Sequence, residues 1–442
     1  MKHFVTLLCV LCVLSAQAAT KPNIVVLVSD DAGYNEFSMH GAKHFPTPRI
    51  DSIAANGVRF TQGYTSGTVC SPTRAGLLTG RYQNRFGHEF NVPPAYSESN
   101  GLSLAETTLP DVLKGAGYRT IALGKWHLGY APKFHPMARG FTDYYGFLQG
   151  SRSYFPLEKP TRLNQLLRDR EPVAEKFDYM TDELARAAAE YITKHKAEPF
   201  FMYLAFNATH GPIHALPSDL AKVPPGGPNP KVQAMTMALD RAVGVVLDEL
   251  KKHNLTDNTL VVFINDNGGV AGRDNTPLRG NKGSTWEGGT RVPFAMQWPA
   301  VLPKGKVFTH PVVSLDIFPT ALAAAGVEKS PGKPLDGVNL VPFLTGKAAG
   351  RPHQTLYWKN GTKWAVRDGD LKLTAGNNEG RKATGKSQPA PALFDLTADQ
   401  GESTDLAAKR TEDIARLTKI YEDWKRDFPK PTWGGGAKEE AD

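Results

Sequence analysis

Four short apolar runs in the sequence end abruptly in polar or ionisable residues. They read NIVVLVSDD (23–31), YRTIALGKWH (118–127), PFFMYLAFNATH (199–210) and NTLVVFINDNGG (258–269). Each run is rich in β-branched or aromatic residues and does not alternate with polar ones, which is typical of a strand buried on both faces. A sheet made of such strands needs helices on both of its sides.

Helical patterns separate these runs. Thr181 is a candidate N-cap for one helix, and Gly117 follows the last turn of another. The patterns cover 108–118, 181–195 and 234–253. This alternation predicts an α/β fold with a helix-covered sheet. Long loops are predicted at 216–231 and 375–392.

The polar ends of the strands predict a site. In open α/β sheets the site lies outside the carboxyl ends of the strands. That rule brings together the groups Asp30/Asp31, Lys125/His127, His210 and Asp266/Asn267. For any one of them, the alternative is an isolated strand-end turn or a helix cap.

The expected site has the composition of a cation centre beside an oxyanion pocket. Its oxygen ligands are Asp30, Asp31, Asp266 and Asn267, and no His or Cys with zinc spacing accompanies them. Such ligands suit Ca²⁺ or Mg²⁺, and Ca²⁺ is preferred because it tolerates irregular ligand sets. The nearby cations, which suit an oxyanion and a departing ester oxygen, are Arg74, Lys125 and Lys282. Two histidines, His127 and His210, can move protons.

The N-terminus has the pattern of a secretory signal peptide. A basic start precedes an apolar run from Phe4 to Leu14, and Ala16-Gln17-Ala18 forms a small-x-small cleavage site. We therefore expect residues 1–18 to be removed on export to the periplasm or beyond; the alternative is a buried N-terminal helix. No lipobox-like cysteine follows this run, and no other apolar stretch is long enough to span a bilayer, so no membrane anchor is expected.

Once residues 1–18 are removed, Cys70 is the only thiol. It can form no disulfide within the chain, which indicates a reactive or modified residue; the alternative is a small buried side chain. Loss of Lys2 lowers the formal charge from +8 to +7. A basic exported protein suits polyanions, although a modest surplus of charge also serves solubility alone.

Three segments carry a family resemblance. CSPTRAGLLTG (70–80) and GYRTIALGKWH (117–127) resemble the two signatures of type I sulfatases, and NDNGG with PLRGNKGSTWEGGTRVP (265–293) resembles their later metal-and-lysine segment. The similarity runs from about Asn23 to about Leu406. Among members of this alkaline-phosphatase superfamily, the chain looks closest to the arylsulfatase and N-acetylgalactosamine-sulfatase group. The resemblance implies a large mixed sheet between helices, with a small C-terminal antiparallel sheet.

The resemblance also implies a modified nucleophile. In these enzymes a separate formylglycine-generating enzyme oxidises the motif cysteine, here Cys70, to Cα-formylglycine, and Pro72 and Arg74 belong to the sequence that it reads. One hydroxyl of the hydrated aldehyde attacks the sulfate ester. The second hydroxyl then loses its proton, which expels sulfate and restores the aldehyde.

The remaining roles are implied in the same way. One Ca²⁺ would be bound by Asp30, Asp31, Asp266, Asn267 and the modified Cys70. Arg74 would contact the modified residue, while Lys125 and Lys282 would hold sulfate oxygens. His127 would aid elimination, and His210, with Lys282 as a further candidate, would protonate the leaving oxygen.

The chain divides into the signal peptide (1–18), a catalytic domain (19–345) and a C-terminal subdomain (346–442). Hairpin signals at Asn360-Gly361 and Asp368-Gly369 separate short strands within 355–374, and 391–407 adds another strand. Residues 408–427 read as an amphipathic helix whose apolar face is Ile414, Leu417, Ile420, Tyr421 and Trp424.

The expected substrate is a sulfated carbohydrate, with galactose-type sugars suggested by the resemblance, and no nucleic-acid partner is expected. Candidate recognition loops cover 86–100, 149–172 and 211–231; their aromatic residues, which either stack on sugars or pack the loops, are Phe90, Tyr96, Tyr154 and Phe155. The alternatives are a phosphonate or phosphodiester hydrolase and a catalytically silent protein that binds sulfated glycans. A two-zinc phosphatase is disfavoured because Asn267, rather than a histidine, follows Asp266.

Overall fold

The structure, a computed structural model, describes residues 21–328, 331–377 and 390–434. The predicted signal peptide and most of the predicted loop 375–392 lie outside the described residues. None of the helices in the described part of the chain is both long enough and apolar enough to cross a membrane.

The four predicted strands lie side by side, all parallel, at the centre of a ten-stranded sheet. Their order is β9 (Thr259–Asn265), β1 (Asn23–Ser29), β8 (Phe200–Ala205) and β4 (Arg119–Lys125). On the β9 side follow β10 (Phe294–Gln297), β2 (Val58–Phe60) and β11 (Lys306–Phe308), and on the β4 side β5 (Asp143–Phe147), β6 (Leu167–Arg168) and β7 (Glu171–Pro172). Antiparallel pairings of β10, β6 and β7 make the sheet mixed, which confirms the predicted fold class.

Strand β1 shows why the central runs do not alternate with polar residues. Ile24, Val26 and Val28 pack into the core on one face, whereas Val25 and Leu27 pack into the core on the other. Burying each such side chain fully is worth about 1.5–3 kcal/mol. Both faces must therefore be covered by helices.

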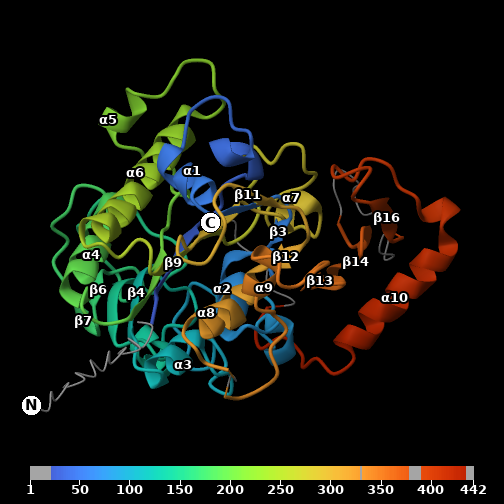
Figure 1. Cartoon of the computed structure of the whole chain (residues 1–442), viewed down its shortest axis with the longest axis horizontal. Helices are drawn as coiled ribbons and strands as arrows, with labels where there is room; N and C mark the ends of the chain where they lie inside the picture. The colour runs from blue at the N-terminus through green and yellow to red at the C-terminus, as the bar shows by residue number, and fades with distance from the viewer. Residues whose placement is uncertain (1–20, 329–330, 378–389, 435–442) are drawn as a thin grey trace, which may run out of the picture.

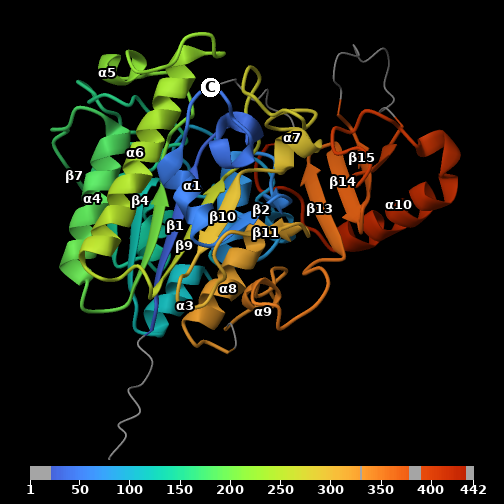
Figure 2. The ribbon, with the colours of Figure 1, turned by 45° about the horizontal axis from the view of Figure 1, so that its top comes forward.

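The helices form a layer on each face of the sheet (Figures 1 and 2). One layer consists of α1 (Pro48–Ala55), α4 (Met180–His195) and α6 (Pro230–Lys252). The other consists of α2 (Cys70–Thr79), α3 (Leu109–Gly115) and α8 (Ile317–Ala324). Shorter elements are β3 (Gly63–Tyr64), paired with β12 (Val312–Val313), and the helices α5 (Pro217–Leu220), α7 (Glu287–Thr290) and α9 (Val341–Leu344). The 3-10 turns are Tyr34–Glu36, Ser38–His40, Gln83–Phe86, Pro132–Phe134, Pro136–Ala138, Ser314–Asp316 and Ala407–Lys409.

Two helix starts differ from the prediction. Thr181 is not a cap: α4 begins one residue earlier, after the extended Tyr179, and Thr181 lies buried in its first turn. Helix α6 begins at Pro230 rather than at 234, because the Asn229 side chain accepts a hydrogen bond from the backbone of Val232 and proline suits a first helical position. Part of the predicted loop 216–231 is therefore helical, including α5.

A separate antiparallel sheet follows, as predicted. Its strands are β13 (Thr355–Asn360), β14 (Lys363–Asp368), β15 (Leu371–Ala375) and β16 (Ala392–Asp395). Both predicted hairpin glycines, Gly361 and Gly369, have positive φ (60° and 61°), a conformation that glycine adopts without strain. Helix α10 (Thr411–Lys425) packs on this sheet through the predicted face and buries Leu417 and Tyr421 (Figure 2).

A buried ionic cluster joins the small sheet to the rest of the chain. Lys372, on β15, places its Nζ 2.8 Å from a carboxylate oxygen of Glu287 on α7 and 3.0 Å from one of Glu402, and all three side chains are inaccessible. Tyr64 donates to Glu287 (2.6 Å), and Arg367 on β14 donates to Tyr64 (2.6 Å). We call these five residues the junction cluster.

The two carboxyl groups of the junction cluster respond differently to burial. Burial favours the neutral acid in both, yet Lys372 lowers the pKa of Glu287 to about 2. Burial, only partly opposed by Lys372, raises the pKa of Glu402 to about 7. Lys372 is thus the cation that the two carboxyl groups share, while Arg291 and Arg367 also lower the pKa of Glu287.

We predict that Lys372→Met destabilises the protein by about 3–5 kcal/mol, because it leaves two buried carboxylates without their shared cation. Thermal or denaturant unfolding measures the change. The exposed Lys409, also in the C-terminal subdomain, gives a matched control: Lys409→Met removes the same charge and should change stability by less than about 0.5 kcal/mol. Equal unfolding of the two variants would contradict the assignment.

Candidate active site

The four strand-end groups meet at the carboxyl edge of the central strands, as predicted. Asp30 and Asp31 follow β1, His210 follows β8, and Lys125 ends β4; Asp266 and Asn267 follow β9. The turn after β8 holds the backbone of Asp30 in place. The Asp30 N–H donates to Ala208 O (2.8 Å), and the Asp30 C=O accepts from the N–H of Thr209 (2.7 Å).

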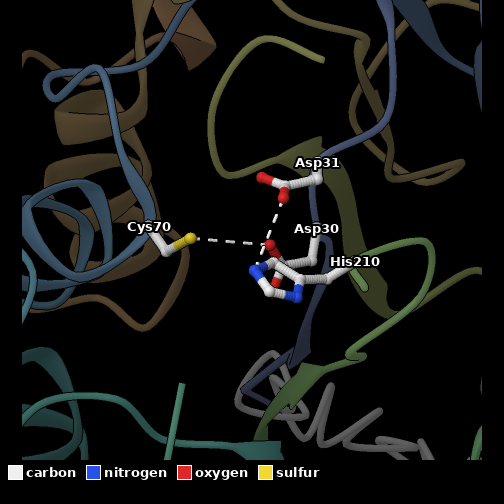
Figure 3. Close-up of side chains that lie close together, drawn as sticks. All are labelled: Asp30, Asp31, Cys70 and His210. Atoms are coloured by element: carbon white, nitrogen blue, oxygen red, sulfur yellow. Dashed lines mark hydrogen bonds and ion pairs between the residues drawn. The ribbon is translucent and has the colours of Figure 1, made fainter. Parts of the chain in front are cut away.

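Cys70 enters this edge from the first position of α2. Val69 before it is extended, so the chain turns into the helix at residue 70. The Cys70 Sγ lies 3.6 Å from Asp30 Oδ1 (Figure 3). Burial, reinforced by Asp30, raises the pKa of the Cys70 thiol. An unmodified Cys70 is therefore a protonated thiol at neutral pH and a poor nucleophile.

Arg74 lies one helical turn after Cys70 and is completely buried. Its Nε and Nη2 donate to Asp266 Oδ2 at 2.9 and 2.7 Å, and Nη2 also reaches Asp30 Oδ2 at 3.1 Å. Its Nη1 donates to Lys125 O at 3.0 Å. The guanidinium thus fixes α2 to the ends of three strands.

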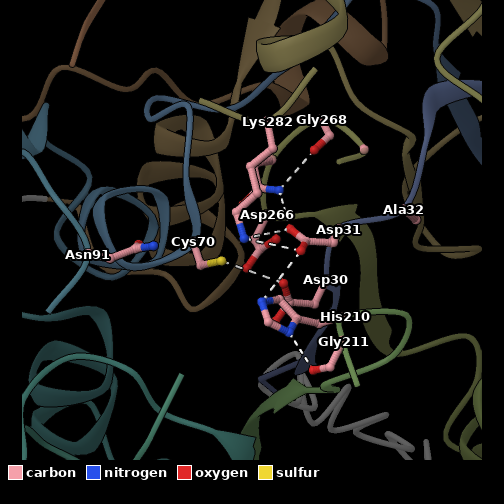
Figure 4. Close-up of polar contacts among 12 residues, drawn as sticks. Asp30, Asp31, Ala32, Cys70, Asn91, His210, Gly211, Asp266, Gly268 and Lys282 are labelled. Atoms are coloured by element: carbon pink, nitrogen blue, oxygen red, sulfur yellow. Dashed lines mark hydrogen bonds and ion pairs between the residues drawn. The ribbon is translucent and has the colours of Figure 1, made fainter. Parts of the chain in front are cut away.

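Two lysines complete the cationic side of the site. Lys125 Nζ lies 2.5 Å from Asp30 Oδ2. Figure 4 shows the second lysine, Lys282, whose Nζ lies 3.0 Å from Asp31 Oδ1. Burial opposes ionisation of Asp30, but Lys125, His210 and Arg74 together lower its pKa. The Lys125 side chain is inaccessible, whereas that of Lys282 is 17% exposed. Lys282 is therefore the lysine on the open side.

His210 points one ring nitrogen at the acidic groups. Its Nδ1 donates to Gly211 O at 2.7 Å, which leaves Nε2 facing Asp31 Oδ2 at 3.4 Å (Figure 3). Burial lowers the pKa of His210, although Asp31 acts in the opposite direction. The tautomer is set by the backbone, so Nε2 is the atom that exchanges a proton with the site.

Of the two alternatives predicted for Tyr154, stacking on a sugar or packing within the loops, the structure shows packing. The side chain is completely buried and stacks on Tyr179. Its hydroxyl lies 2.5 Å from Asn207 O and 2.9 Å from His210 O, so Tyr154 supports the turn that carries His210. Two other predicted mouth aromatics, Phe90 and Phe155, are half-buried, while Tyr96 is 38% exposed beneath Arg162.

His127 lies beside the site but hydrogen-bonds to it only through its backbone. Its ring packs on Gly150, where an added Cβ would come within 2.6 Å of it. Its carbonyl accepts from Ser71 Oγ at 2.7 Å, next to Cys70. Burial lowers the pKa of His127 well below its usual value, and its Nδ1 is buried with no hydrogen-bond partner among the described residues. The ring is therefore neutral.

Sequence reasoning missed the residues behind the motif. Because Ser71 Oγ donates to His127, it accepts from His88 Nε2 at 2.6 Å. The ring of His88 meets Trp433 edge-on, and the Trp433 indole N–H donates to Asn91 O at 2.7 Å. Asn91 in turn accepts from the backbone of Ser71 at 3.0 Å. Only Ser71 lies within a recognisable motif; His88 and Asn91 carry no local signal.

Asn265, the last residue of β9, was also missed. Its Oδ1 accepts from Ser29 Oγ at 2.7 Å, and its Nδ2 donates to Ala32 O at 3.0 Å. The side chain therefore ties the turn after β1 to the turn after β9. Its place between a buried strand and Asp266 was the available signal.

The oxygen atoms of the site fit a bound cation. Asn267 Nδ2 donates to Asp31 Oδ1 (2.7 Å) and Gly268 O (2.9 Å), which fixes the amide. Asn267 Oδ1 and Asp266 Oδ1 are buried without a hydrogen-bond partner among the described residues. Leaving such atoms unpaired is costly, and ligating a cation would satisfy them.

Electrostatics support the same fit. Potential ligand atoms of Asp30, Asp31, Cys70 and His210 lie within 4.8 Å of one another. Burial and the neighbouring Asp30 raise the pKa of Asp266 to about 6. A divalent cation offsets this crowding of carboxylates, and the oxygen-rich donor set suits Ca²⁺.

Comparison with known proteins identifies the family. The Sulfatase family model matches residues 22–327. The N-acetylgalactosamine-6-sulfatase of Sus scrofa is 31% identical over 450 residues, covering 91% of this chain and 85% of the relative. The uncharacterized sulfatase YdeN of Escherichia coli (strain K12) is 32% identical over 395 residues, covering 76% of this chain and 68% of the relative.

Solved structures agree. Ps i-CgsB, crystallised in complex with k-i-k-neocarrahexaose, superposes with a TM-score of 0.87 at 34% identity and covers 95% of this chain and 96% of its own. The phosphonate monoester hydrolase of Agrobacterium radiobacter shares the fold, with a TM-score of 0.64 at 19% identity over 90% of this chain and 94% of its own. The chain belongs to the sulfatase family and is a sulfuric ester hydrolase.

Proposed function

We propose that this enzyme removes an O-sulfate from a sulfated carbohydrate, using formylglycine made from Cys70 and one bound Ca²⁺. The observation that carries the proposal is the setting of residue 70. Its side chain lies 3.6 Å from Asp30, at a buried edge where Arg74, Lys125 and Lys282 oppose the carboxylates. Such an edge stabilises a sulfate group and the charge that develops on it.

Residue 70 needs the modification to act. Its thiol has a raised pKa, and a simple alcohol or thiol would be left carrying the sulfate. Formylglycine, when present as its hydrate, supplies one hydroxyl for attack on sulfur and a second whose deprotonation releases sulfate. Because residue 70 is 1% exposed in the fold, a formylglycine-generating enzyme must reach the motif before the chain folds, during export with the signal peptide 1–18.

The metal would be held by Asp30, Asp31, Asp266 and Asn267, with residue 70 facing it. Ca²⁺, when bound, would supply positive charge to the reacting oxygens. Arg74 holds Asp266 and Asp30 in place for this role through the bonds described above. The carboxylates in turn keep Lys282 charged: although burial opposes it, Asp31 raises the pKa of Lys282.

The remaining residues bind sulfate and move protons. Lys282, on the open side, and Lys125, beneath it, would bind sulfate oxygens. His210 presents Nε2 to the site, and in its protonated form it would donate the Nε2 proton to the leaving oxygen and return to the neutral ring. His127 is neutral and buried, which suits a base that takes the proton of the second hydroxyl.

Relatives and charge support a carbohydrate substrate. One relative is named for an N-acetylgalactosamine 6-sulfate, and Ps i-CgsB was crystallised with a neocarrahexaose. The formal charge, +8 for the whole sequence and +7 without residues 1–18, favours a polyanionic chain. We therefore propose an O-sulfated, galactose-type sugar within a polysaccharide or its fragments.

We predict sulfate release from sulfated galactan or galactosaminoglycan oligosaccharides. The rate at limiting substrate should fall as salt rises, because screening shortens the reach of the positive field to about 10 Å at 0.1 M. Ion chromatography of released sulfate measures the rate, with a neutral chromogenic glycoside as a blank. Efficient hydrolysis of a steroid or simple aryl sulfate, with no release from any carbohydrate, would overturn the substrate but not the sulfatase assignment. Preference for an aryl phosphonate over the matching aryl sulfate would favour the phosphonate alternative.

We predict that residue 70 is formylglycine in active protein and that Cys70→Ser binds substrate but does not turn over. The serine ester has no second hydroxyl with which to expel sulfate, so the variant should trap a sulfated residue 70. Peptide mass spectrometry detects both species. Wild-type protein produced without a converting enzyme is the control and should be inactive. Full activity of protein with an unmodified thiol would refute the assignment.

We predict that Asp266→Asn lowers calcium content and activity together, the latter by at least about 100-fold, because one ligand oxygen loses its charge. Elemental analysis and sulfate release measure the two effects. The exposed Asp257 gives a control: Asp257→Asn should change neither. Two zinc ions and no calcium in active protein would show the metal assignment to be wrong.

A further inference from the structure

The turn between β13 and β14, residues 360–363, lies against the two segments that carry residue 70 and Lys282. Asn360 Nδ2 donates to Thr68 Oγ1 at 2.8 Å, and Lys363 Nζ donates to Gly283 O at 2.7 Å. These two segments are also joined directly, since Gly283 N–H donates to Thr68 O at 2.8 Å. The small C-terminal sheet therefore reaches the rim of the active site through this turn.

A buried carboxylate holds the turn in place. Glu89 accepts from the backbone N–H of Gly361 at 2.6 Å, and its ion pair with Lys359 measures 2.5 Å. Asn84 adds a hydrogen bond to Lys359 O at 3.2 Å. The charge of Lys359 is neutralised by Glu89, and the turn needs no further cation for its own geometry.

Lys363 differs from its neighbours because its charge is not neutralised. Its Nζ contacts the carbonyl of Gly283, and among the described residues no carboxylate lies within 4.0 Å of it. The atom lies close to the segment that precedes residue 70: a Cβ added to Gly283 would lie 3.9 Å from Lys363 Nζ and 4.0 Å from a methyl of Val69. An ammonium has three donors, and the carbonyl uses one of them.

We propose that Lys363 is a specificity-determining residue that binds a second anionic group of the substrate, a sulfate or a carboxylate, close to the scissile sulfate ester. The inference rests on the proposed carbohydrate substrate, whose chain carries several anionic groups. Lys282, one residue before Gly283, is paired with Asp31 in the site, whereas Lys363 Nζ contacts the backbone carbonyl of Gly283 and no carboxylate of the described residues. The two lysines thus serve different anions of one ligand.

The test compares substrates that differ by one anionic group. The probes are galactose 6-sulfate, a galactan disaccharide with two sulfates, and a disaccharide in which a uronate carboxylate replaces the second sulfate. The variants are Lys363→Met, Lys363→Gln, which keeps a donor for Gly283 O without the charge, and Lys363→Arg, which keeps the charge. Lys409→Met, at an exposed position of the same subdomain, is the matched control for net charge.

We expect Lys363→Met and Lys363→Gln to lower kcat/KM about tenfold on substrates with a second anion, mainly through KM, because a charge-assisted contact is lost. Both variants should hydrolyse galactose 6-sulfate at a rate within about twofold of the wild-type rate. Lys363→Arg should restore the wild-type preference for substrates with a second anion. Lys409→Met should match the wild type. The disaccharide whose kcat/KM falls more in Lys363→Met and Lys363→Gln identifies the second anion as sulfate or carboxylate.

Other outcomes separate the possible failures. An equal loss on all three substrates would mean that Lys363 only positions Gly283 and Lys282, and an unchanged preference would mean that it does not contact substrate; either result overturns the inference. If Lys363→Met fails to fold in a thermal unfolding assay, Lys363→Gln decides the question. A wild-type enzyme that releases no sulfate from any of the three probes would instead contradict the proposed carbohydrate substrate.

Discussion

The ion pairs of Arg74 are the interaction on which the rest of the site depends. A single inaccessible guanidinium bonds to Asp266, Asp30 and the end of β4, and it does so from the helix that presents residue 70. Buried carboxylates are stable as anions only when cations and donors surround them. Arg74 therefore favours the anionic form of Asp30 and Asp266 and fixes the position of residue 70, the proposed nucleophile, relative to them.

The pairing of buried acidic groups with basic side chains continues away from Arg74. Lys125 neutralises Asp30 and Lys282 neutralises Asp31, so each acidic ligand of the proposed cation has its own basic partner. Farther out, Lys372 neutralises Glu287 in the segment that follows Lys282. The small sheet is thus bound to the catalytic edge by charge as well as by apolar packing.

The strands and the strand-end groups were predictable because their signals are local. An unalternated run such as 258–264 can be satisfied only in a doubly covered sheet, and parallel strands bring their carboxyl ends to one edge. Tyr154 and the junction cluster were not predictable in this way. Tyr154 is buried because it stacks on Tyr179, and Lys372 forms an ion pair with Glu402. Both contacts join residues that are far apart in the sequence, so no local pattern announces them. The prediction of Thr181 as the N-cap of α4 was wrong for a similar reason. Residues around Thr181 are buried, and tertiary packing decides where the helix starts.

The contact between Trp433 and the segment 88–91 has a consequence for the timing of synthesis. His88 and Asn91 hold Ser71, the neighbour of residue 70, and Trp433 packs on both of them. The support of the motif helix is therefore incomplete until residue 433 has left the ribosome or the translocation channel. Position 433 lies 363 residues after position 70, and at translation rates of about 5–20 residues per second that length takes on the order of 20–70 seconds to make. Under the proposed function, a formylglycine-generating enzyme would act on the motif within that interval, before this support is in place.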